Sequence, residues 1–339
     1  MSPLTQRRLQ IFRANKRGFW SLWIFLFIFL GTLFAEGIAN DKPLLIKYKD
    51  SYYWPVVTIY SEQAFGGDFK SEAIYRDPHV AEEIKAHGWM IWPPIRYDYS
   101  TINYDSPTPA PSPPSGENWL GTDDQGRDVL ARLIYGFRIS ILFGLSLTIL
   151  SSIIGILAGA IQGYFGGLVD LIFQRIIEIW SNLPELFVLI ILASIITPNF
   201  GWLLGILLLF SWMSLSGLVR AECLRARNFD YVKAARALGV SEGKIMLRHV
   251  LPNALVSSMT VIPFIMAGSI TVLTSLDFLG FGLPPGSPSL GELLLQGKQN
   301  LQAPWLGITG FLVSSLMLVL IVFISDAVRE AFDPRRGPA

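Results

Sequence analysis

The chain has 339 residues, of which 51% are hydrophobic and only 16% charged, whereas soluble domains carry about 25% charged residues. A mean hydropathy of +0.44 and the grouping of apolar residues into long uncharged blocks predict a membrane protein and exclude a single soluble core. The net charge of +1 gives no basis for attraction of the whole chain to nucleic acid. One cysteine excludes an internal disulfide framework, and three histidines far apart in sequence argue against a metal centre, so no bound metal is expected.

Long uncharged blocks predict the membrane spans, because about 20 apolar residues cross the hydrocarbon of a bilayer. One block, residues 186–219, is too long for a single helix and contains the turn signal Thr197-Pro198-Asn199. We interpret it as a hairpin whose first arm starts near Leu171. The other four spans are predicted at residues 18–35, 139–161, 254–276 and 304–325, which makes six in total.

Lys and Arg near the ends of the spans predict the orientation, because cytoplasmic loops carry an excess of these residues. Residues 1–17 hold five basic and no acidic side chains, and residues 220–249 hold seven basic against three acidic ones. Both segments and the arginine-containing C-terminus are therefore expected in the cytoplasm, with residues 40–118 outside. A cleaved signal peptide would share the basic N-terminus, but the apolar run here exceeds the roughly 7 to 15 residues of such a peptide.

Residues 40–118 form a polar segment rich in Tyr and Trp that ends in a proline-rich tract at residues 107–114. Proline-rich sequence favours an extended conformation, so this tract is predicted to be a spacer leading back to the membrane. The rest of the segment has the size of a small folded element. Two interpretations stay open: a solvated loop packed on the membrane surface, and a docking surface for a soluble partner.

Residues 119–138 are predicted to form an interfacial amphipathic helix that leads into the second span. Apolar residues recur with helical spacing between Val129 and Ile134. Asp123 or Asp124 is a suitable N-cap for this helix. The pattern by itself gives the helix no functional role.

The loop at residues 220–253 is too long for a tight turn and carries two helical patterns. Gly239 follows the first pattern, and glycine suits the left-handed position that ends a helix. Ser241 is the predicted N-cap of the second helix, which begins at Glu242 and which Pro252 is expected to end. An ordinary amphipathic connector would share this pattern, but a short helix held between two spans can also transmit force to them.

The same loop resembles the EAA loop of binding-protein-dependent ABC importer permeases. The resemblance rests on Ala234-Ala235, on Gly239 and on the run from His249 to Asn253. Lys233 departs from the family pattern, in which glutamate is usual at this position. The resemblance implies that the loop couples the chain to an ATPase through Ala234, Ala235, Gly239, Ser241, Glu242, His249, Leu251 and Pro252.

Further motifs extend the resemblance over residues 115–339. Residues 120–140 match the LGTD-x-x-GRDV-x-x-R-x-x-x-G-x-R-x-S signature of the dipeptide and oligopeptide permease branch. Its family-signature residues are Gly121, Thr122, Asp123, Gly126, Arg127, Asp128 and Arg138. Residues 276–284, 291–294 and 326–334 resemble other family motifs. The N-terminal third, through residues 40–45 and 92–96, is most similar to the Yej-type (YejE-like) peptide and microcin C permeases.

The resemblance implies an all-α integral membrane fold with six transmembrane helices, the type I ABC importer permease fold, and a periplasmic insertion between helices 1 and 2. The expected location is the bacterial inner membrane, multi-pass, with both termini cytoplasmic. The expected parts are a cytoplasmic N-terminus (1–17), transmembrane helix 1 (18–39), a periplasmic segment (40–118), the interfacial helix (119–138) and a permease core with five transmembrane helices (139–339) that contains the coupling loop (220–253).

The function implied is that of a permease subunit that imports peptides by alternating access, with peptide antibiotics such as microcin C as further candidate substrates. The chain has no G-x-x-x-x-G-K-[ST] phosphate loop, so it is expected to bind no cofactor and not to be an enzyme. Cytoplasmic ABC ATPase subunits are expected to bind ATP and Mg²⁺ and to hydrolyse the ATP. The other implied partners are a second, homologous permease subunit in a heterodimer, a periplasmic peptide-binding protein and membrane lipid, with no nucleic acid.

The alternative is a secondary transporter or channel for small solutes, and a membrane-anchored enzyme is a third hypothesis. A secondary transporter usually carries ionisable residues or broken helices near the bilayer midplane, and spans two, five and six have none in their uncharged cores. Residues 40–118 contain no recognisable nucleophile with a base. The residues that contact substrate are not predicted, because a sequence-tolerant peptide cavity has no fixed motif.

Overall fold

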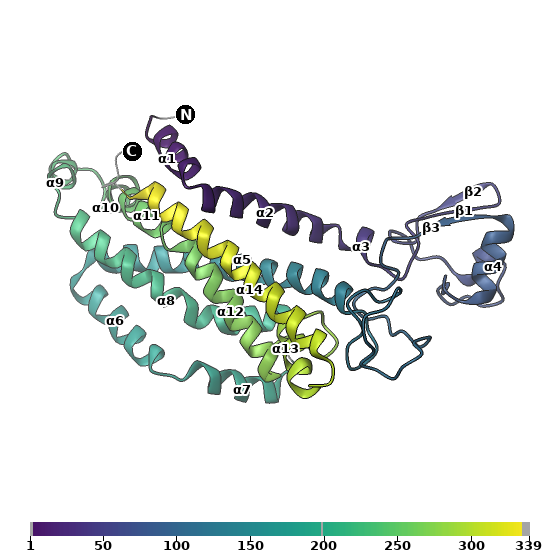
Figure 1. Cartoon of the computed structure of the whole chain (residues 1–339). Coiled ribbons are helices and arrows are strands. Elements are labelled where there is room, and N and C mark those ends of the chain that lie inside the picture. The colour runs from purple at the N-terminus through teal and green to yellow at the C-terminus, as the bar shows by residue number, and fades with distance from the viewer. Residues whose placement is uncertain (1–2, 198, 334–339) are drawn as a thin grey trace. The chain divides into compact units, whose positions relative to one another are not determined.

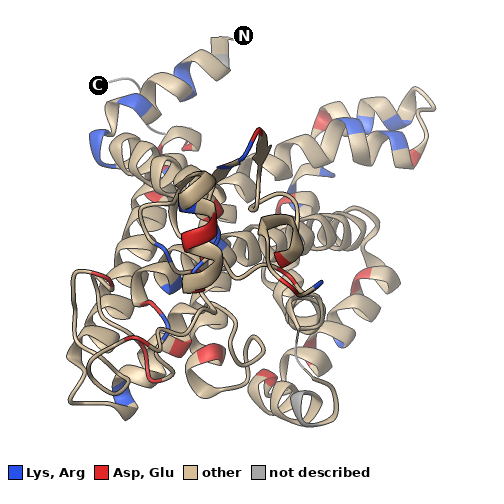
Figure 2. Cartoon of the chain, turned by 90° about the vertical axis from the view of Figure 1, so that its right-hand side faces the viewer, with Lys and Arg blue, Asp and Glu red and all other residues tan. Residues whose placement is uncertain are grey.

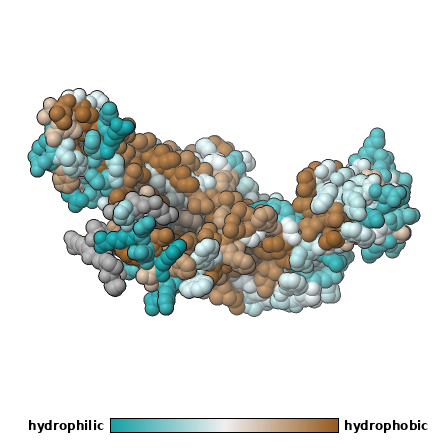
Figure 3. All heavy atoms as spheres, turned by 90° about the horizontal axis from the view of Figure 1, so that it is seen from above, coloured by the Kyte–Doolittle hydropathy of each residue, from teal (hydrophilic) through white to brown (hydrophobic). Residues whose placement is uncertain are grey.

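The computed structural model describes residues 3–197 and 199–333, and most of this part of the chain is α-helical (Figure 1). Figure 2 shows long stretches of helix without charged positions, and apolar side chains cover much of the surface over the long helices (Figure 3). A helix satisfies its backbone hydrogen bonds internally, as hydrocarbon requires. Among the described residues, five helices are long and apolar enough to cross a membrane: α2 (Lys16–Leu33), α5 (Val129–Phe165), α8 (Phe200–Ala226), α12 (Ile262–Leu279) and α14 (Pro304–Phe332).

The chain divides into two compact units. The core unit comprises Met1–Phe27, Ser140–Pro284 and Ser315–Ala339, and the insertion unit comprises Ile28–Ile139 and Pro285–Ser314. Besides parts of the long helices, the core unit contains α1 (Pro3–Ala14), α6 (Gly167–Ser181), α7 (Glu185–Ile195), α9 (Asp230–Ala237), α10 (Glu242–Ile245), a π-helical turn (Met246–Val250) and α11 (Leu251–Met259). The insertion unit contains α3 (Ala35–Ile38), a 3-10 turn (Glu62–Phe65), α4 (Pro78–His87), α13 (Leu290–Gln299) and the strands β1 (Leu45–Tyr48), β2 (Ser51–Tyr53) and β3 (Gly88–Ile91).

A close contact between α5 and α8 organises the core unit. Three glycines recur every fourth residue of α5, and a Cβ on any of them would lie 2.4–2.6 Å from a carbonyl oxygen of α8. The pairs are Gly155 with Trp212, Gly159 with Ser216, and Gly163 with Arg220. Gln162 donates a hydrogen bond of 2.9 Å to the Ser216 hydroxyl in the same interface. Small residues let helix backbones approach closely in a membrane, where lipid removes the hydrophobic drive for association.

The predicted hairpin has one continuous arm and one divided arm. The continuous arm is α8, whose N-cap Asn199 accepts a hydrogen bond of 2.9 Å from the Trp202 N–H. The other arm is divided into α6 and α7, of 15 and 11 residues. Pro184 explains the division, because proline has no N–H to continue a helix and disfavours helix at the residue before it. The helices end at Ile195 and restart at Phe200, as the turn signal predicts, while Pro198 lies outside the described residues.

The span expected at residues 254–276 is confirmed as one apolar helix, α12 (Ile262–Leu279), but its expected start is wrong. The structure has two helices, α11 and α12, with Thr260 and Val261 between them. Pro263 lies in the first turn of α12. The N–H groups of a first turn have no partner within their own helix, so α12 loses no hydrogen bond to this proline. The same missing N–H prevents α11 from continuing through residue 263. The predicted spans at residues 18–35, 139–161 and 304–325 each coincide with one long helix, although α14 continues to Phe332.

The polar segment at residues 40–118 has a hydrophobic core of its own, as expected of a small folded element. Its three strands form an antiparallel sheet in the order β2-β1-β3, with Ile46 opposite both Tyr53 and Met90. Val80 and Ile84 of α4 are buried in one cluster with Ile46. The all-α expectation therefore holds for the long apolar helices but misses this small sheet.

The prediction that residues 107–114 form an extended spacer is wrong. The Ser112 N–H donates to the Thr122 hydroxyl (2.8 Å), and the Thr122 N–H donates to the Ser112 carbonyl (2.9 Å). The Ser112 hydroxyl also donates to the Thr108 carbonyl (2.9 Å). Small polar residues between the prolines supply these donors and acceptors, so the tract folds back onto residue 122 instead of extending.

Residues 119–128 are not helical, and the predicted interfacial helix is the beginning of one long helix, α5. Gly126 has φ of +82°, which interrupts any helix begun at Asp123 or Asp124. The cap is Asp128, whose Oδ1 accepts the Ala131 N–H at 2.7 Å. Asp123 instead closes a turn by accepting the N–H groups of Gln125 and Arg127, each at 2.9 Å.

We predict that Gly159→Leu lowers the melting temperature of the purified protein in detergent. The added side chain would meet the Ser216 carbonyl at the α5–α8 contact, and overpacking of this kind costs about 1–3 kcal/mol. Gly205→Leu is the matched control, because a Cβ at Gly205 on α8 meets nothing within 4 Å. Equal melting temperatures for the two variants would contradict the close contact.

Candidate functional site

The predicted coupling loop folds as a short helix, a left-handed glycine and a second short helix. The helix α9 ends at Ala237, and Gly239 has φ of +75°, as the sequence predicts. The Val240 N–H donates back to the Ala235 carbonyl (3.2 Å), which closes the end of the helix. Ser241 occupies the N-cap position of α10, but its side chain makes no capping hydrogen bond, and its carbonyl accepts the Lys244 and Ile245 N–H groups instead.

The expectation that Pro252 ends the second helix is wrong. The chain continues from α10 through the π-helical turn into α11, and Pro252 lies in the first turn of α11. The wider π turn changes the backbone hydrogen-bond pattern just before Pro252. The helical stretch therefore tolerates the missing N–H of this proline. The His249 carbonyl accepts hydrogen bonds of 3.3 Å from both Tyr231 and Asn253 and so ties α9 to this continuous stretch.

The helix α9 has one face packed inward and one face open. Val232 and Ala235 are buried in the core cluster that also contains Val219 of α8. Ala234 is exposed on the opposite side, and Leu238, at the end of the helix, is 83% exposed. Small and apolar side chains on an open surface are suited to contact with another protein.

A polar cluster ties the coupling loop to the end of α5. The Tyr164 hydroxyl donates to Glu242, and Arg236 donates to both oxygens of the same carboxylate, at 2.9 and 3.2 Å. The hydrogen bonds from Arg236 and Tyr164 lower the pKa of Glu242, so the carboxylate is ionised at neutral pH. Of these residues only Glu242 was expected from the motif, because the sequence gives no signal for a pairing with Tyr164, which lies 78 residues away.

Two of the family-signature residues, Asp123 and Arg127, form a second cluster with Arg132 and Glu292, which lies wholly in the insertion unit. Arg127 Nε donates to Asp123 Oδ2 at 2.6 Å, and Arg127 Nη2 donates to Glu292 Oε1 at 3.1 Å. Arg132 donates to the other oxygen of Glu292 at 2.7 Å and to the Ser287 carbonyl at 2.9 Å. Glu292 therefore bridges two guanidinium groups that are almost fully buried.

Local structure places each member of this ion cluster. Ser289 caps α13 by accepting the N–H groups of Gly291 and Glu292, so Glu292 sits in the first turn of that helix. Burial lowers the pKa of Arg127, but the hydrogen bonds and charges of Asp123 and Glu292 together more than offset this, and the pKa is raised overall. Arg132 and Glu292 lie within the sequence motifs, but their pairing across 160 residues could not be predicted from spacing.

Three more signature residues lie next to this cluster in the chain and make bonds of their own, and one pairs elsewhere. Asn118 donates to Asp128 Oδ2 at 2.8 Å, and burial still raises the pKa of this aspartate. The Thr122 carbonyl accepts the Trp305 indole N–H at 3.1 Å, next to Gly121 in its left-handed conformation. Arg138 instead pairs with Glu36 at 2.9 Å and so connects α5 to α3.

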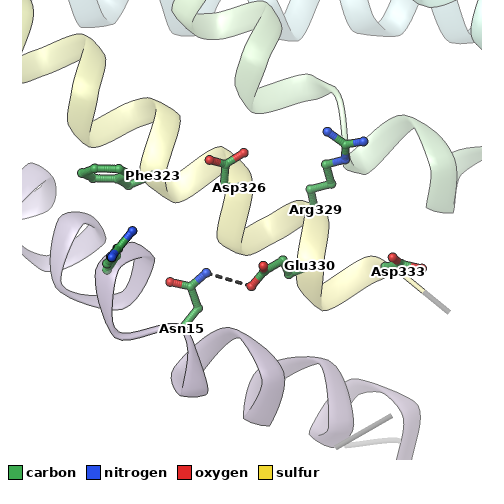
Figure 4. Close-up of a pocket in the computed structure, with 7 residues that line it drawn as sticks. Asn15, Phe323, Asp326, Arg329, Glu330 and Asp333 are labelled. Atoms are coloured by element: carbon green, nitrogen blue, oxygen red, sulfur yellow. Dashed lines mark hydrogen bonds between the residues drawn. The ribbon is translucent and has the colours of Figure 1, made fainter. Parts of the chain in front are cut away.

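The C-terminal motif faces the first helices of the chain. Figure 4 shows Asn15 and Glu330 pointing toward each other, and Asn15 Nδ2 donates to Glu330 Oε2 at 2.8 Å. Both line a cavity of about 400 Å³ together with Arg17 and Arg329. A Cβ on Gly18 would lie 2.2 Å from that of Ala327, so α2 and α14 pack at short distance here. Pro334 and the two arginines that follow it lie outside the described residues.

Within residues 3–197 and 199–333, no group of three or more His, Cys, Asp and Glu side chains is arranged to hold a metal ion. The carboxylates of the two clusters are instead paired with guanidinium groups. Both clusters therefore position helices and loops.

Comparison with known proteins defines the class to which this membrane chain belongs. Residues 133–338 match the family described as "Binding-protein-dependent transport system inner membrane component". The chain is 60% identical over 337 residues to the inner membrane ABC transporter permease protein YejE of Escherichia coli K12, covering 99% of both chains. It is 57% identical to the peptidoglycan transport system permease protein YejE of Agrobacterium fabrum (99% and 94% coverage) and 35% identical to the oligopeptide transport system permease protein OppC of Lactococcus lactis IL1403 (67% and 78%).

The chain is thus a multi-pass membrane component of a transport system. It belongs to the family of binding-protein-dependent inner-membrane permeases, as its resemblance to the EAA-loop proteins indicated. The matched region begins inside α5 and contains the coupling loop and the C-terminal motif.

We predict that Glu292→Gln lowers the melting temperature of the detergent-purified protein. It leaves Arg127 and Arg132, which are 3% and 0% exposed, with only the Asp123 charge between them. Loss of one partner of a buried ion pair costs about 3–5 kcal/mol, and the partial exposure of Glu292 (21%) places this loss toward the lower value. The control is Glu82→Gln, which changes an exposed carboxylate on α4. A melting temperature for Glu292→Gln that matches this control would show that the bridge adds no stability.

Proposed function

We propose that this chain is a permease subunit of an ATP-driven importer that takes up peptides from outside the inner membrane. The observation that carries the proposal is the exposed α9–Gly239–α10 surface, anchored to α5 through Glu242, in a chain of the binding-protein-dependent family. Relatives named as oligopeptide and peptidoglycan permeases support a peptide-containing substrate. A secondary transporter is not favoured, because the family depends on a binding protein.

The coupling loop gives a physical route from ATP hydrolysis to the membrane helices. Cytoplasmic ABC ATPase subunits bind ATP and Mg²⁺, and this chain binds neither and is not an enzyme. Their closure moves α9 and α10, which contact them through Ala234, Leu238 and neighbouring side chains. Tyr164 and Arg236 hold Glu242, so the movement reaches α5 and, through the glycine contact, α8. The spans then alternate between inward-open and outward-open arrangements.

The topology proposed for the chain has six spans. The divided arm α6–α7 serves as the sixth span beside the five long helices, because its two pieces together have the length to cross the hydrocarbon. Both termini and the coupling loop lie in the cytoplasm, and residues 40–118 form a periplasmic insertion. The excess of Lys and Arg at residues 1–17 and 220–249 supports this orientation.

The proposed assembly needs further chains. A second, homologous permease subunit forms a heterodimer with this one and completes the substrate path between them, two ATPase subunits bind below, and a periplasmic peptide-binding protein delivers the substrate. The lipid-facing surface of the long helices, with many exposed apolar side chains, contacts the bilayer. Peptide antibiotics of the microcin C type are further candidate substrates.

We predict that Gly239→Val strongly reduces peptide uptake in vesicles that contain the whole transporter, its binding protein and ATP. A β-branched residue at φ of +75° costs about 1–2 kcal/mol where glycine is at ease, and the turn that orients α9 and α10 would change. Gly243→Val is the control, because Gly243 also has open space around it but lies in α10 without a positive φ.

Uptake in the unmodified vesicles should require ATP and persist when ion gradients are dissipated. Uptake driven by an ion gradient without ATP would contradict the importer. Normal uptake by Gly239→Val at equal protein level would contradict the coupling role of the loop.

A further inference from the structure

The insertion unit contains a cavity of about 810 Å³, which we call the outer cavity. Its walls come from α4, from β3 and from the loops at residues 75–76, 92–97 and 116–119. Three tryptophans and three basic residues line it: Trp89, Trp92, Trp119, Arg76, Lys85 and Arg96. Its volume lies within the range of about 300–1,000 Å³ that is usual for ligand sites.

One wall of the outer cavity is the strand β3, whose other edge pairs with no further strand in the part of the chain that the structure describes. The strand β3 pairs with β1 and is the last strand of the sheet. Gly88, Trp89 and Met90 of this strand line the cavity. A strand edge with free backbone groups can accept an extended segment of another chain by strand addition.

The charge of the cavity is predominantly positive. Arg76, Lys85 and Arg96 are opposed by Glu117 alone among its lining residues. Arg76 is held in place, because it donates to the Tyr97 hydroxyl at 2.8 Å and stacks 4.1 Å above the Tyr97 ring. The same hydroxyl donates to Glu117 at 3.1 Å, so this carboxylate already has a partner. Lys85 and Arg96 are exposed at the wall and can reach a ligand.

We propose that the outer cavity is the docking site for an acidic, extended segment of the soluble binding protein. The segment adds along β3, its carboxylates pair with Lys85 and Arg96, and its apolar side chains lie against the tryptophans. Imported peptides vary in sequence and share only their terminal carboxylate, whereas two exposed cations beside a strand edge suit a segment with several fixed carboxylates, which favours the binding protein over the cargo. This inference rests on the proposed function, because only a binding-protein-dependent importer has such a partner.

The test uses the whole transporter in lipid nanodiscs and its peptide-loaded binding protein. Lys85→Glu and Arg96→Glu are made singly, and Lys70→Glu is the matched control, because Lys70 is exposed in the same segment and does not line the cavity. Each cavity variant should weaken binding of the loaded binding protein by about fivefold or more at low salt, as loss of a complementary charge does. The effect should shrink at high salt, where exposed charges are screened.

The remaining readouts separate this inference from the proposed function. Hydrolysis of ATP without binding protein should be unchanged in all three variants, and Lys70→Glu should bind within twofold of the unmodified transporter. Binding within twofold by both cavity variants, or an equal loss in Lys70→Glu, would overturn the docking site while leaving the importer intact. If the loaded binding protein neither binds nor stimulates the unmodified transporter, the proposed function fails together with the inference.

Discussion

The close contact between α5 and α8 is the interaction on which the rest of the core unit depends. Lipid provides no hydrophobic drive for two apolar helices to associate, so their contact relies on van der Waals packing at short distance. Glycine at positions 155, 159 and 163 of α5 makes that distance attainable. The same contact fixes the end of α5, where Tyr164 meets Glu242, relative to the end of α8, from which the coupling loop continues.

The two polar clusters differ in burial and in what they stabilise. Asp123, Arg127, Arg132 and Glu292 hold the chain before α5 against α13, where almost no water reaches the guanidinium groups. Such a buried cluster fixes geometry at a substantial desolvation cost. Arg236 and Glu242 are half-exposed and add little stability of their own. They suit the shift that we propose for this surface, while Val232 and Ala235 keep α9 attached to the core.

The sequence predicts best what depends on composition and local backbone chemistry. Apolar blocks located α2, α5, α8 and α14, and Gly239 is left-handed as its position after a helix indicates. Pro184 and Pro263 can be seen in the sequence and lie at the start of α7 and α12. Whether a proline divides an apolar block into two helices depends on tertiary packing, which the sequence does not show. The cap at Asp128 was missed because Gly126 moves the start of the helix, and the Arg132–Glu292 pair was missed because distant pairing leaves no local pattern.

The most direct test of the coupling role is site-specific cross-linking from Leu238, which is 83% exposed at the end of α9. A photoreactive amino acid at this position, in the whole transporter in native membranes, should cross-link to the ATPase subunit, with a yield that changes when a non-hydrolysable ATP analogue is added. The same group at Tyr104, which is 85% exposed in the insertion unit, should give no such product. Absence of an ATPase cross-link at Leu238, or an equal yield at Tyr104, would contradict the role of this loop.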